Sequence, residues 1–446
     1  MNKIRKRIRG TTIAVVPFLS KPTGGNDMKK LITLILALML AMGMNTATAE
    51  KKEIDGLTPR KIEIHKAGLN PSADEMIAQG ISPTTGRQLE KIKTPDGFLG
   101  TAVTGVYQPI MVQISNSNNG IGKDEEGNPY AVAPVNGSYA DVVYEACQTM
   151  NGSETRMSMV FSDTVPDYVG FLRSTRLTHV RLRQEWDCVF CTSGYSNADV
   201  PAEWRTMGVK NPSGRTEEDP GIVYVGDVGL NKPWKQYVRR LKGILDANNE
   251  VFELAKILES VVPADHVPAN HTWKFTDELP EDGDPAEIIY VTFGSQYDTD
   301  SRLEYDETDN VYVRYVEMQN DQDLPYRESV MRNPENVDEK KNGVLSLRVK
   351  LDDRVPGNMI TFSNVIVQGV TMKWKGSTRP DPVMTGTGNA DYFIGGRHIA
   401  GVWEREDYNS RTVFYGPDGE EIELQRGRTL IILMGYNNRS TSVSYE

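Results

Sequence analysis

Beyond residue 285 the chain is a succession of short apolar segments separated by turn signals. The segments are rich in Val, Ile, Tyr and Phe, and Gly, Pro, Asp and Asn punctuate the gaps, for example at 306–310 and 416–419. Such segments predict short β-strands. The predicted strands are 288–293, 310–315, 344–351, 364–368, 398–404, 412–415 and 429–433. Their spacing favours a mainly antiparallel β-rich C-terminal domain over residues 285–446.

The preceding part, residues 105–284, mixes the two types of element. Strands are predicted at 110–114, 141–146, 156–161 and around 187–192, and helices at 174–186 and 241–258. Alternation of this kind favours a mixed α/β layered domain. The Pro- and acid-rich stretch 263–284 predicts the boundary between the two domains. The expected fold class is therefore α+β.

Residues 50–104 are polar, rich in Gly, Pro, Thr and Lys, and weakly periodic. They are predicted to be a linker or lead-in with one short helix near 72–79.

The first 49 residues predict a secretory signal. Lys29 and Lys30 precede an uncharged apolar run, 31–44, and a small-x-small triplet ends at Ala49. Translation starting at Met28 and cleavage after Ala49 fit this pattern. The apolar run is shorter than the roughly 20 residues that cross a bilayer, so an uncleaved anchor is the alternative. With no Cys near the cleavage point, lipoprotein anchoring has no acceptor thiol. We therefore expect export to the cell envelope or beyond.

The net charge of the chain limits the classes of partner that it can bind. The whole chain carries −11, and residues 1–49 carry eight Lys/Arg and one Asp, a net of +7, which leaves −18 for the rest. Such a chain repels nucleic acid and anionic lipid as a whole, so any anion site must be a local cluster of Arg or Lys. Membrane contact is expected only through an uncleaved signal.

Three cysteines are present, Cys147, Cys188 and Cys191. The spacing of the last two matches a redox pair, but the segment reads as a strand, which places alternate side chains on opposite faces. Three buried thiols are the simplest expectation, and pairing of Cys147 with one of the others is the alternative.

Sequence motifs for nucleotide, zinc-protease or serine-hydrolase chemistry are absent, and the five histidines lack metal-ligand spacing. We expect no metal and no cofactor.

The segment 169–176 is the main candidate for a site. It follows a predicted strand and opens a predicted helix, with Arg173 and Arg176 on one face and Ser174 between them. Two guanidinium groups at a helix N-terminus form a good anion receptor. The alternative is that the arginines pair with Asp141, Glu145 or Asp187 and only tie strands to the helix.

Several blocks of sequence, in order, resemble one family. They are 82–86, 109–116, 140–145, 155–156, 169–176, 187–191, 305–306, 312–315, 364–368, 386–388, 403, 415–419 and 427–429. Together they are similar to the YerB-like exported proteins, a domain of unknown function numbered 3048. The resemblance implies two domains, export, often a lipid anchor, and no assigned activity.

The family pattern Gly-Pro-Val-Arg-Ser-Ala-Arg aligns with residues 170–176, so the resemblance carries over both arginines. Family members also tend to have two histidines whose places here are held by Thr192 and by the segment 233–235. Their absence argues against His-based catalysis.

The leading hypothesis is a protein that binds an anionic envelope component or peptide outside the membrane. The predicted site residues are Arg173, Arg176, Ser174, Asn116, Glu145, Arg156 and Ser196. One alternative is an envelope hydrolase that uses Glu145 or Asp141 as general base. Another is a structural partner of an envelope protein, recognisable by a large exposed apolar patch.

Overall fold

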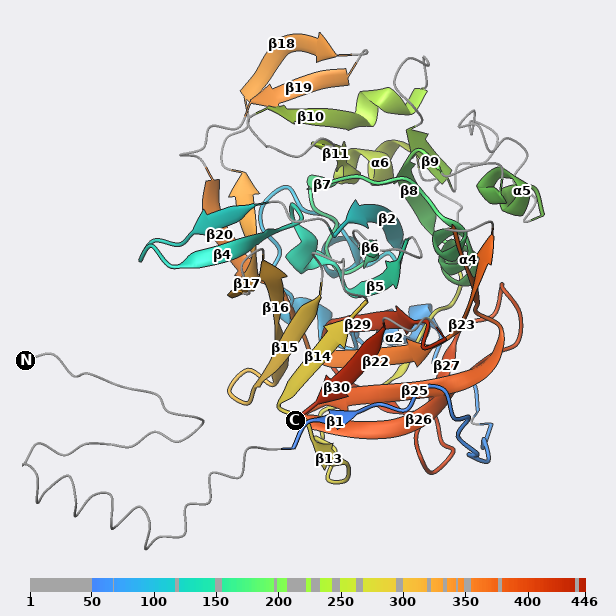
Figure 1. Ribbon diagram of the computed structural model, residues 1–446. Helices are drawn as coiled ribbons and strands as arrows, with labels where there is room; N and C mark the ends of the chain where they lie inside the picture. Colours follow the sequence, from blue (N-terminus) through green and yellow to red (C-terminus); the bar gives the residue numbers. More distant parts are fainter. Residues whose placement is uncertain are drawn as a thin grey trace, which may run out of the picture. The chain divides into compact units, whose positions relative to one another are not determined.

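The computed structural model (Figure 1) describes the greater part of the chain beyond the predicted leader. The described residues are 50–66, 68–116, 120–148, 155–195, 199–206, 222–225, 233–242, 249–261, 268–293, 300–318, 322–331, 335–341, 344–348, 354–375, 379–437 and 441–446. The predicted signal, residues 1–49, lies outside them, and so does Ser196. Among the helices of this described part, none combines the length and apolar character needed to cross a membrane.

The largest sheet is built on strands that are buried along their whole length. Strand β2 (Ile110–Ser115) is buried at every position, as are β5 (Val142–Cys147) and β29 (Thr429–Met434). Continuous apolar runs of this kind are typical of strands covered on both faces. In spatial order the sheet contains β13 (Asp284–Pro285), β26 (Arg397–Arg405), β25 (Gly386–Ile394), β22 (Asn364–Gly369), β29, β5, β6 (Thr155–Phe161), β2, β8 (Val189–Ser193) and β9 (Ile222–Val225), with β27 (Val413–Tyr415) beside β26.

Strand directions in this sheet are mixed. The pairs β22–β29, β29–β5, β2–β8 and β8–β9 are parallel, whereas β6 runs antiparallel between β5 and β2. The predicted strands of residues 110–161 are confirmed as β2, β5 and β6. The antiparallel pairing predicted for the C-terminal part is found here in β22–β25–β26, whereas β22 and β29 are parallel.

Strands from both sides of the predicted boundary at residue 284 share this sheet. β29 lies between β22 and β5, and Thr429 pairs with Asn364 on one side and with Val142 on the other. Residues 51–446 accordingly form one unit by their contacts. The two parts of the sequence are continuous through the middle of the sheet, which hydrophobic patterning alone did not indicate.

A second sheet is mainly antiparallel and mostly C-terminal in sequence. Its members in order are β1 (Lys52–Glu53), β30 (Ser442–Tyr445), β14 (Ile288–Thr292), β15 (Ser301–Asp306), β16 (Val311–Met318), β17 (Gln322–Met331), β4 (Pro129–Ala133) and β3 (Ile121–Lys123), with β20 (Arg354–Met359) on β17 and β21 (Thr361–Phe362) on β16.

Three smaller sheets complete the β structure. One has the order β18 (Glu335–Lys341), β19 (Val344–Arg348), β10 (Val238–Lys242), β11 (Glu250–Glu253) and β7 (Tyr168–Gly170), and the others pair β12 (Lys274–Thr276) with β28 (Glu423–Gln425) and β23 (Thr371–Lys375) with β24 (Arg379–Val383).

Helices are few and short. They are α2 (Ala73–Ala78), α3 (Thr101–Thr104), α4 (Leu177–Trp186), α5 (Asp199–Thr206) and α6 (Leu254–Val261), with the 3-10 turns η1 (Leu89–Lys91), η2 (Gly137–Tyr139) and η4 (Pro233–Tyr237). The fold is thus mostly β, and the expected weight of helix in the N-terminal part is too high.

Two helix predictions have different outcomes. The helix predicted at 72–79 is confirmed as α2, with Ser72 and Glu75 forming a capping box. The helix predicted at 241–258 is wrong over its first half. Val251 and Phe252 belong to β11, paired with β10 and β7, and helix begins only at Leu254. Pairing with neighbouring strands outweighed local helical spacing.

The lead-in after residue 50 is fastened to the sheets. Lys52 in β1 pairs with Tyr445 in β30. Arg60 donates to the carbonyls of Ala390 and Gly401 at 2.6 and 3.0 Å and forms an ion pair with Asp391 at 2.6 Å. The segment predicted as a linker therefore packs as part of the fold.

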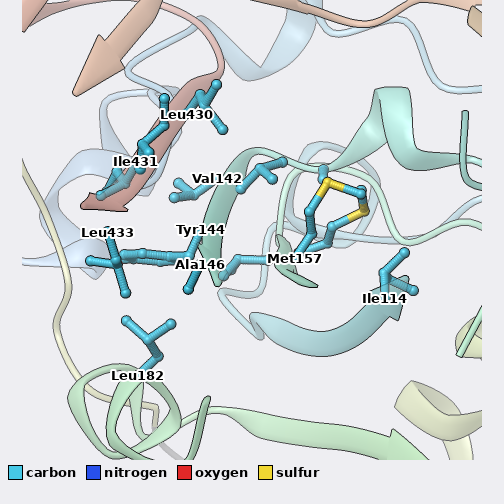
Figure 2. Close-up of a cluster of buried hydrophobic side chains, with 14 of the residues drawn as sticks. Ile114, Val142, Tyr144, Ala146, Met157, Leu182, Leu430, Ile431 and Leu433 are labelled. Atoms are coloured by element: carbon cyan, nitrogen blue, oxygen red, sulfur yellow. The ribbon is translucent and has the colours of Figure 1, made fainter. Parts of the chain in front are cut away.

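The core fills the space against both faces of the large sheet. Figure 2 shows side chains of β5 (Val142, Tyr144, Ala146) and of the neighbouring strand β29 (Leu430, Ile431, Leu433), with Leu182 of α4 close by. All seven are buried, at 3% exposure or less. The helix α4 is thereby held on the sheet beside β5, and this fixes where its N-terminus lies.

Candidate functional site

The predicted site residues gather where parallel strands of the large sheet end. Asn116 follows β2, Gln148 follows β5, and Gly194 and Tyr195 follow β8. These three strands run in the same direction, so their carboxyl ends share one edge. In sheets with parallel strands, ligands bind in the crevice outside that edge.

The backbone of residues 173–175 is fixed at this edge by hydrogen bonds to two strands. The Arg173 N–H donates to the Gln113 carbonyl at 3.0 Å, and the Ser193 N–H donates to the Arg173 carbonyl at 3.2 Å. The Thr175 N–H donates to the Gly194 carbonyl at 3.0 Å. The loop before α4 is thus held between β2 and β8, which presents its side chains at a fixed position.

Two guanidinium groups converge on Ser174. Arg156, near the start of β6, donates from Nη1 to the Ser174 hydroxyl at 3.0 Å and also to the Ser174 carbonyl. Arg176 donates from Nη1 to the same hydroxyl at 3.0 Å and from Nη2 to Gln148 Oε1 at 3.4 Å. The structure therefore brings together Arg156, Ser174 and Arg176 of the predicted set.

Arg173 lies beside them, half-buried, and its backbone completes the loop described above. Arg156, Arg173 and Arg176 each take part in interactions additional to those named here. A ligand bound at this edge would therefore contact side chains that already interact with other groups of the protein.

Helix α4 begins at this cluster, with Arg176 as its N-cap. The Arg176 N–H donates to Nδ1 of His179, which is buried at 3% exposure. Burial lowers the pKa of His179 well below its usual value, and the positive charges of Arg156 and Arg176 lower it further. His179 is therefore a neutral acceptor, and the local potential at the helix N-terminus is positive.

Glu145 and Asn116 lie beneath the cluster, in the interior. Glu145 forms an ion pair with Arg314 of β16 at 2.9 Å and accepts from Thr155 at 2.6 Å and from Asn116 at 2.8 Å. Asn116 Oδ1 in turn accepts from the Tyr326 hydroxyl at 3.1 Å. Glu145 and Arg314 are both fully buried. This network connects the interior below the carboxyl ends of β2 and β5 to strands β16 and β17 of the second sheet.

Asp141, the other carboxylate considered for catalysis, lies just before β5 at the opposite end of that strand. Its Oδ2 accepts from the N–H groups of Ser162 and Asp163 at 2.7 and 2.9 Å. Burial raises the pKa of Asp141 to about 7, and the nearby charge of Asp163 contributes in the same direction. Asp163 accepts from the hydroxyls of Ser82 and Thr85 at 2.5 and 2.6 Å.

The three carboxylates proposed above as internal partners of Arg173 and Arg176 contact other groups. Asp141 contacts Ser162 and Asp163, Glu145 is paired with Arg314, and Asp187 lies 3.6 Å from Arg183. Arg173 and Arg176 also take part in interactions additional to those named here, so the scaffold alternative stays a prediction.

Hydrolysis by either proposed base would require a carboxylate within reach of a substrate. Asp141 and Glu145 are exposed by 1% and 0%, so neither meets solvent. Three open cavities, of about 1120, 940 and 320 Å³, are lined instead by the lead-in, by residues 270–284 and by C-terminal strands and loops.

The cysteines and metal ligands offer no alternative chemistry in the described residues. Cys147, Cys188 and Cys191 are free and buried, and burial raises the pKa of Cys147 and of Cys188 to about 12. A thiol with such a pKa is a poor nucleophile at neutral pH. Within the ranges given above, no three His, Cys, Asp or Glu side chains come together as a metal site would need.

Several residues that organise the site were not identified from the sequence. Arg314 and Tyr326 come from strands more than 150 residues away from Asn116 and Glu145. Asp163, whose charge acts on Asp141, lies two residues beyond the predicted strand 156–161, and this position is its one sequence signal.

The arrangement as a whole is that of a mixed α/β sheet protein with an arginine-lined edge. Comparison with known families gives a more specific identification. Residues 126–239 match the N-terminal domain, and residues 345–431 the C-terminal domain, of the family described as Protein of unknown function (DUF3048). Both domains of this family are therefore present in the chain, and the resemblance to the YerB-like proteins stated from its sequence blocks is confirmed.

A solved structure has the same fold. It is the crystal structure of the YerB protein from Bacillus subtilis, with a TM-score of 0.52 and 17% sequence identity. The similarity covers 81% of this chain and 99% of that one. A search of curated proteins gave no match.

Proposed function

We propose that this protein is exported and binds an anionic ligand at the carboxyl edge of β2, β5 and β8. The observation that carries the proposal is the convergence of Arg156 and Arg176 on Ser174, at 3.0 Å each, where α4 begins. Guanidinium groups and a helix N-terminus both favour negative charge. Because the remainder of the chain is acidic, an anion is drawn to such a site only locally.

Binding is better supported than hydrolysis. Binding needs only the arginines at the edge, whereas hydrolysis needs a base that reaches a water molecule. Glu145 is occupied by Arg314, Thr155 and Asn116, and Asp141 is enclosed by backbone donors. The proposed ligands are therefore those of a binding protein: an anionic envelope component or an acidic peptide.

The binding part of the proposal is tested with the purified protein and a panel of anionic cell-wall fragments and acidic peptides. Arg176→Ala is expected to weaken binding of the responding ligand at least tenfold. Arg183→Ala is the matched control, because it removes the same charge from the far end of the same helix, where Arg183 lies 3.6 Å from Asp187. Unchanged binding in Arg156→Ala and Arg176→Ala, measured by calorimetry, would remove the site.

The export part rests on the basic n-region, apolar run and Ala-x-Ala triplet before Glu50. Mass spectrometry of the protein isolated from cells is expected to find a mature N-terminus at Glu50 in the envelope or extracellular fraction. An unprocessed chain recovered from the cytosol would contradict it. A stable complex with an envelope protein that persists in Arg156→Ala/Arg176→Ala would favour the structural-partner alternative.

A further inference from the structure

The cavity of about 940 Å³ lies along the side of strand β26 that faces away from β25. On that side β13 pairs with the first two residues of β26, and β27 pairs with residues 402–404. Between these partners no described strand pairs with Ile399 or Ala400, and both residues line the cavity. Its other walls come from within the segments 274–284 and 416–425. The cavity therefore lies at a gap in the pairing of the large sheet.

Negative charge dominates the walls of this cavity. Lys274 is the one lysine or arginine among the described residues that line it. Some lining carboxylates belong to ion pairs, for example Asp284 with Lys52 at 2.8 Å. Other lining carboxylates form no ion pair with any described residue, and these are Glu278, Glu281, Asp282, Asp418 and Glu423. A cleft lined by charge of one sign concentrates ions of the opposite sign, so this cavity favours a cation.

His398 adds a hydrogen-bond acceptor to the same cavity. Its side chain is 10% exposed, and its Nε2 lies 2.7 Å from Oδ1 of Asp391, which is 1% exposed and also forms an ion pair with Arg60 at 2.6 Å. An ionised carboxylate only accepts hydrogen bonds, so Nε2 carries the hydrogen, and Nδ1 is the acceptor of the neutral ring. No described residue bonds to Nδ1, and this nitrogen is not sealed from solvent.

The remaining lining is apolar and suits an organic cation better than a metal ion. It includes Leu279, Ile394, Ile399 and Ile422, and the Leu279 side chain is 49% exposed. Ligand pockets commonly combine apolar walls with a few directed polar groups. Within the described residues no three His, Cys, Asp or Glu side chains come together as metal ligands would. A ligand with a hydrocarbon chain and a cationic end matches both kinds of wall.

We infer that this cavity binds an organic cation with N–H donors, an ammonium or guanidinium group on an apolar chain, and that His398 Nδ1 accepts a hydrogen bond from it. The unpaired carboxylates of the walls supply the opposite charge. The inference goes beyond the proposed function and does not depend on it, because no described residue that lines the cavity belongs to the arginine-lined edge.

The test compares probes that differ in charge or in N–H donors. Isothermal calorimetry is run at low salt and pH 8.0, where an ordinary histidine is neutral, with 1,6-diaminohexane, hexamethonium and adipate. Hexamethonium has the charge and spacer of the diamine but no N–H donor, and adipate has the opposite charge. The diamine is expected to bind about tenfold or more tightly than adipate, and about threefold or more tightly than hexamethonium. Added salt is expected to weaken binding of both cations.

The same measurement distinguishes two sources of the cation. Spermidine represents a free polyamine, and acetylated, amidated trilysine represents a basic segment of a peptide. Both carry ammonium groups on apolar chains, so both are expected to bind more tightly than adipate. The one that binds more tightly identifies the source.

Variants separate the charge of the walls from the histidine acceptor. Glu281→Gln/Asp282→Asn removes two exposed charges from the wall and is expected to weaken diamine binding about fivefold. Glu125→Gln/Glu126→Gln is the matched control, because it removes two adjacent exposed carboxylates that do not line the cavity, and a change of less than about 1.5-fold is expected. His398→Phe keeps an aromatic ring without an acceptor. It is expected to abolish the preference for the diamine over hexamethonium and to leave hexamethonium binding within about twofold of the wild type.

Three results would overturn the inference. They are undetectable binding of the diamine, adipate binding as tightly as the diamine, and wild-type protein that binds the diamine and hexamethonium equally. Circular dichroism confirms that each variant is folded. If His398→Phe does not fold, the comparison of the two cations on the wild-type protein still decides the role of His398. Each of these results leaves the anion site at Arg156 and Arg176 to its own test.

Discussion

The two ends of strand β5 have opposite electrostatic character. At its amino end, Asp141 and Asp163 lie side by side in the interior, held by backbone N–H groups and by Ser82 and Thr85. At its carboxyl end, about 20 Å away by the rise of a strand, Arg156 and Arg176 share Ser174. Like charges are brought together at both ends. Arg156 is buried, at 6% exposure, as Asp141 is at 1%, and Arg176 is half-buried.

The difference shows how like charges are accommodated in the two places. In the interior, the carboxylates find hydroxyl and amide donors, and the raised pKa of Asp141 lets it hold a proton. Arginine cannot lose its proton in a protein. The arginine pair therefore stays charged, and its recorded acceptors are the neutral hydroxyl and carbonyl of Ser174 and the amide oxygen of Gln148.

The largest expected effect concerns the buried pair that lies between the two ends. Arg314→Ala leaves Glu145 charged and buried without its guanidinium partner, and breaking such a pair costs about 3–5 kcal/mol of unfolding free energy. Urea denaturation measures it. Arg314→Met combined with Glu145→Gln is expected to recover most of the loss. A cost of less than about 1 kcal/mol for Arg314→Ala alone would show that the buried Glu145 does not depend on its ion pair with Arg314.

The second effect is a dependence of stability on pH, and it comes from buried carboxyl groups such as Asp141 at the amino end of β5. The pKa of Asp141 is raised from 3.8 to about 7, so the folded state binds the proton more tightly than the unfolded state. Its contribution to stability is fully present below pH 3.8 and is lost by the time pH has risen through about 7. The slope is up to about 1.4 kcal/mol per pH unit. Burial also raises the pKa of Glu328 to about 7, so this group contributes to the pH dependence with the same sign.

Asp141→Asn tests this dependence because asparagine keeps the shape and cannot ionise. Asp163, Arg87 and Arg428 are the charged groups that act on Asp141, and they are unchanged in the variant. Thermal unfolding between pH 5 and 8 is expected to show a smaller loss of stability with rising pH than in the wild type. An identical pH profile would rule out Asp141 as its source.

A smaller effect is expected at the edge. Ser174→Ala removes the hydroxyl shared by Arg156 and Arg176 but keeps the carbonyl that both also contact. The loss of two hydrogen bonds at a half-buried position is expected to cost about 1 kcal/mol of unfolding free energy. Chemical denaturation checks it. A loss comparable to that of Arg314→Ala would mean that the edge is as structural as the interior.

The smallest effect is expected for Arg183→Ala. Its ion pair with Asp187 spans 3.6 Å and the Asp187 side chain is 55% exposed, so solvent screens the pair, although the Arg183 side chain is only 11% exposed. A change of about 1 kcal/mol or less in unfolding free energy is expected. A larger change would disqualify Arg183 as the matched control for the arginine variants at the edge.

Sequence patterning predicted the strands that position the site. β2, β5 and β6 are continuous or alternating apolar runs, and the loop before α4 follows from the turn residues after β6. Arg156, Ser174 and Arg176 were predicted together and lie together. The local pattern was sufficient because these residues occupy strand ends and a helix start, which short windows define.

The parts that were not predicted depend on long-range pairing. Nothing near Glu145 in the sequence indicates Arg314, which comes from another sheet. The segment 241–258 has helical spacing. Val251 nevertheless pairs with Arg239 and with Gly170, so this part of the segment forms a strand. Such outcomes depend on which neighbours are available, and a single sequence does not show this.

One consequence for folding follows from the place of β29. This strand lies between β22 and β5 and pairs with both, yet it spans residues 429–434. Neither neighbour can acquire its partner on that side until residues 429–434 have been synthesised, far along the chain from β5. Non-local pairing of this kind makes folding slow, because loop closure precedes any gain from contact. A polypeptide emerging gradually from a ribosome would therefore keep its central sheet open until β29 arrived.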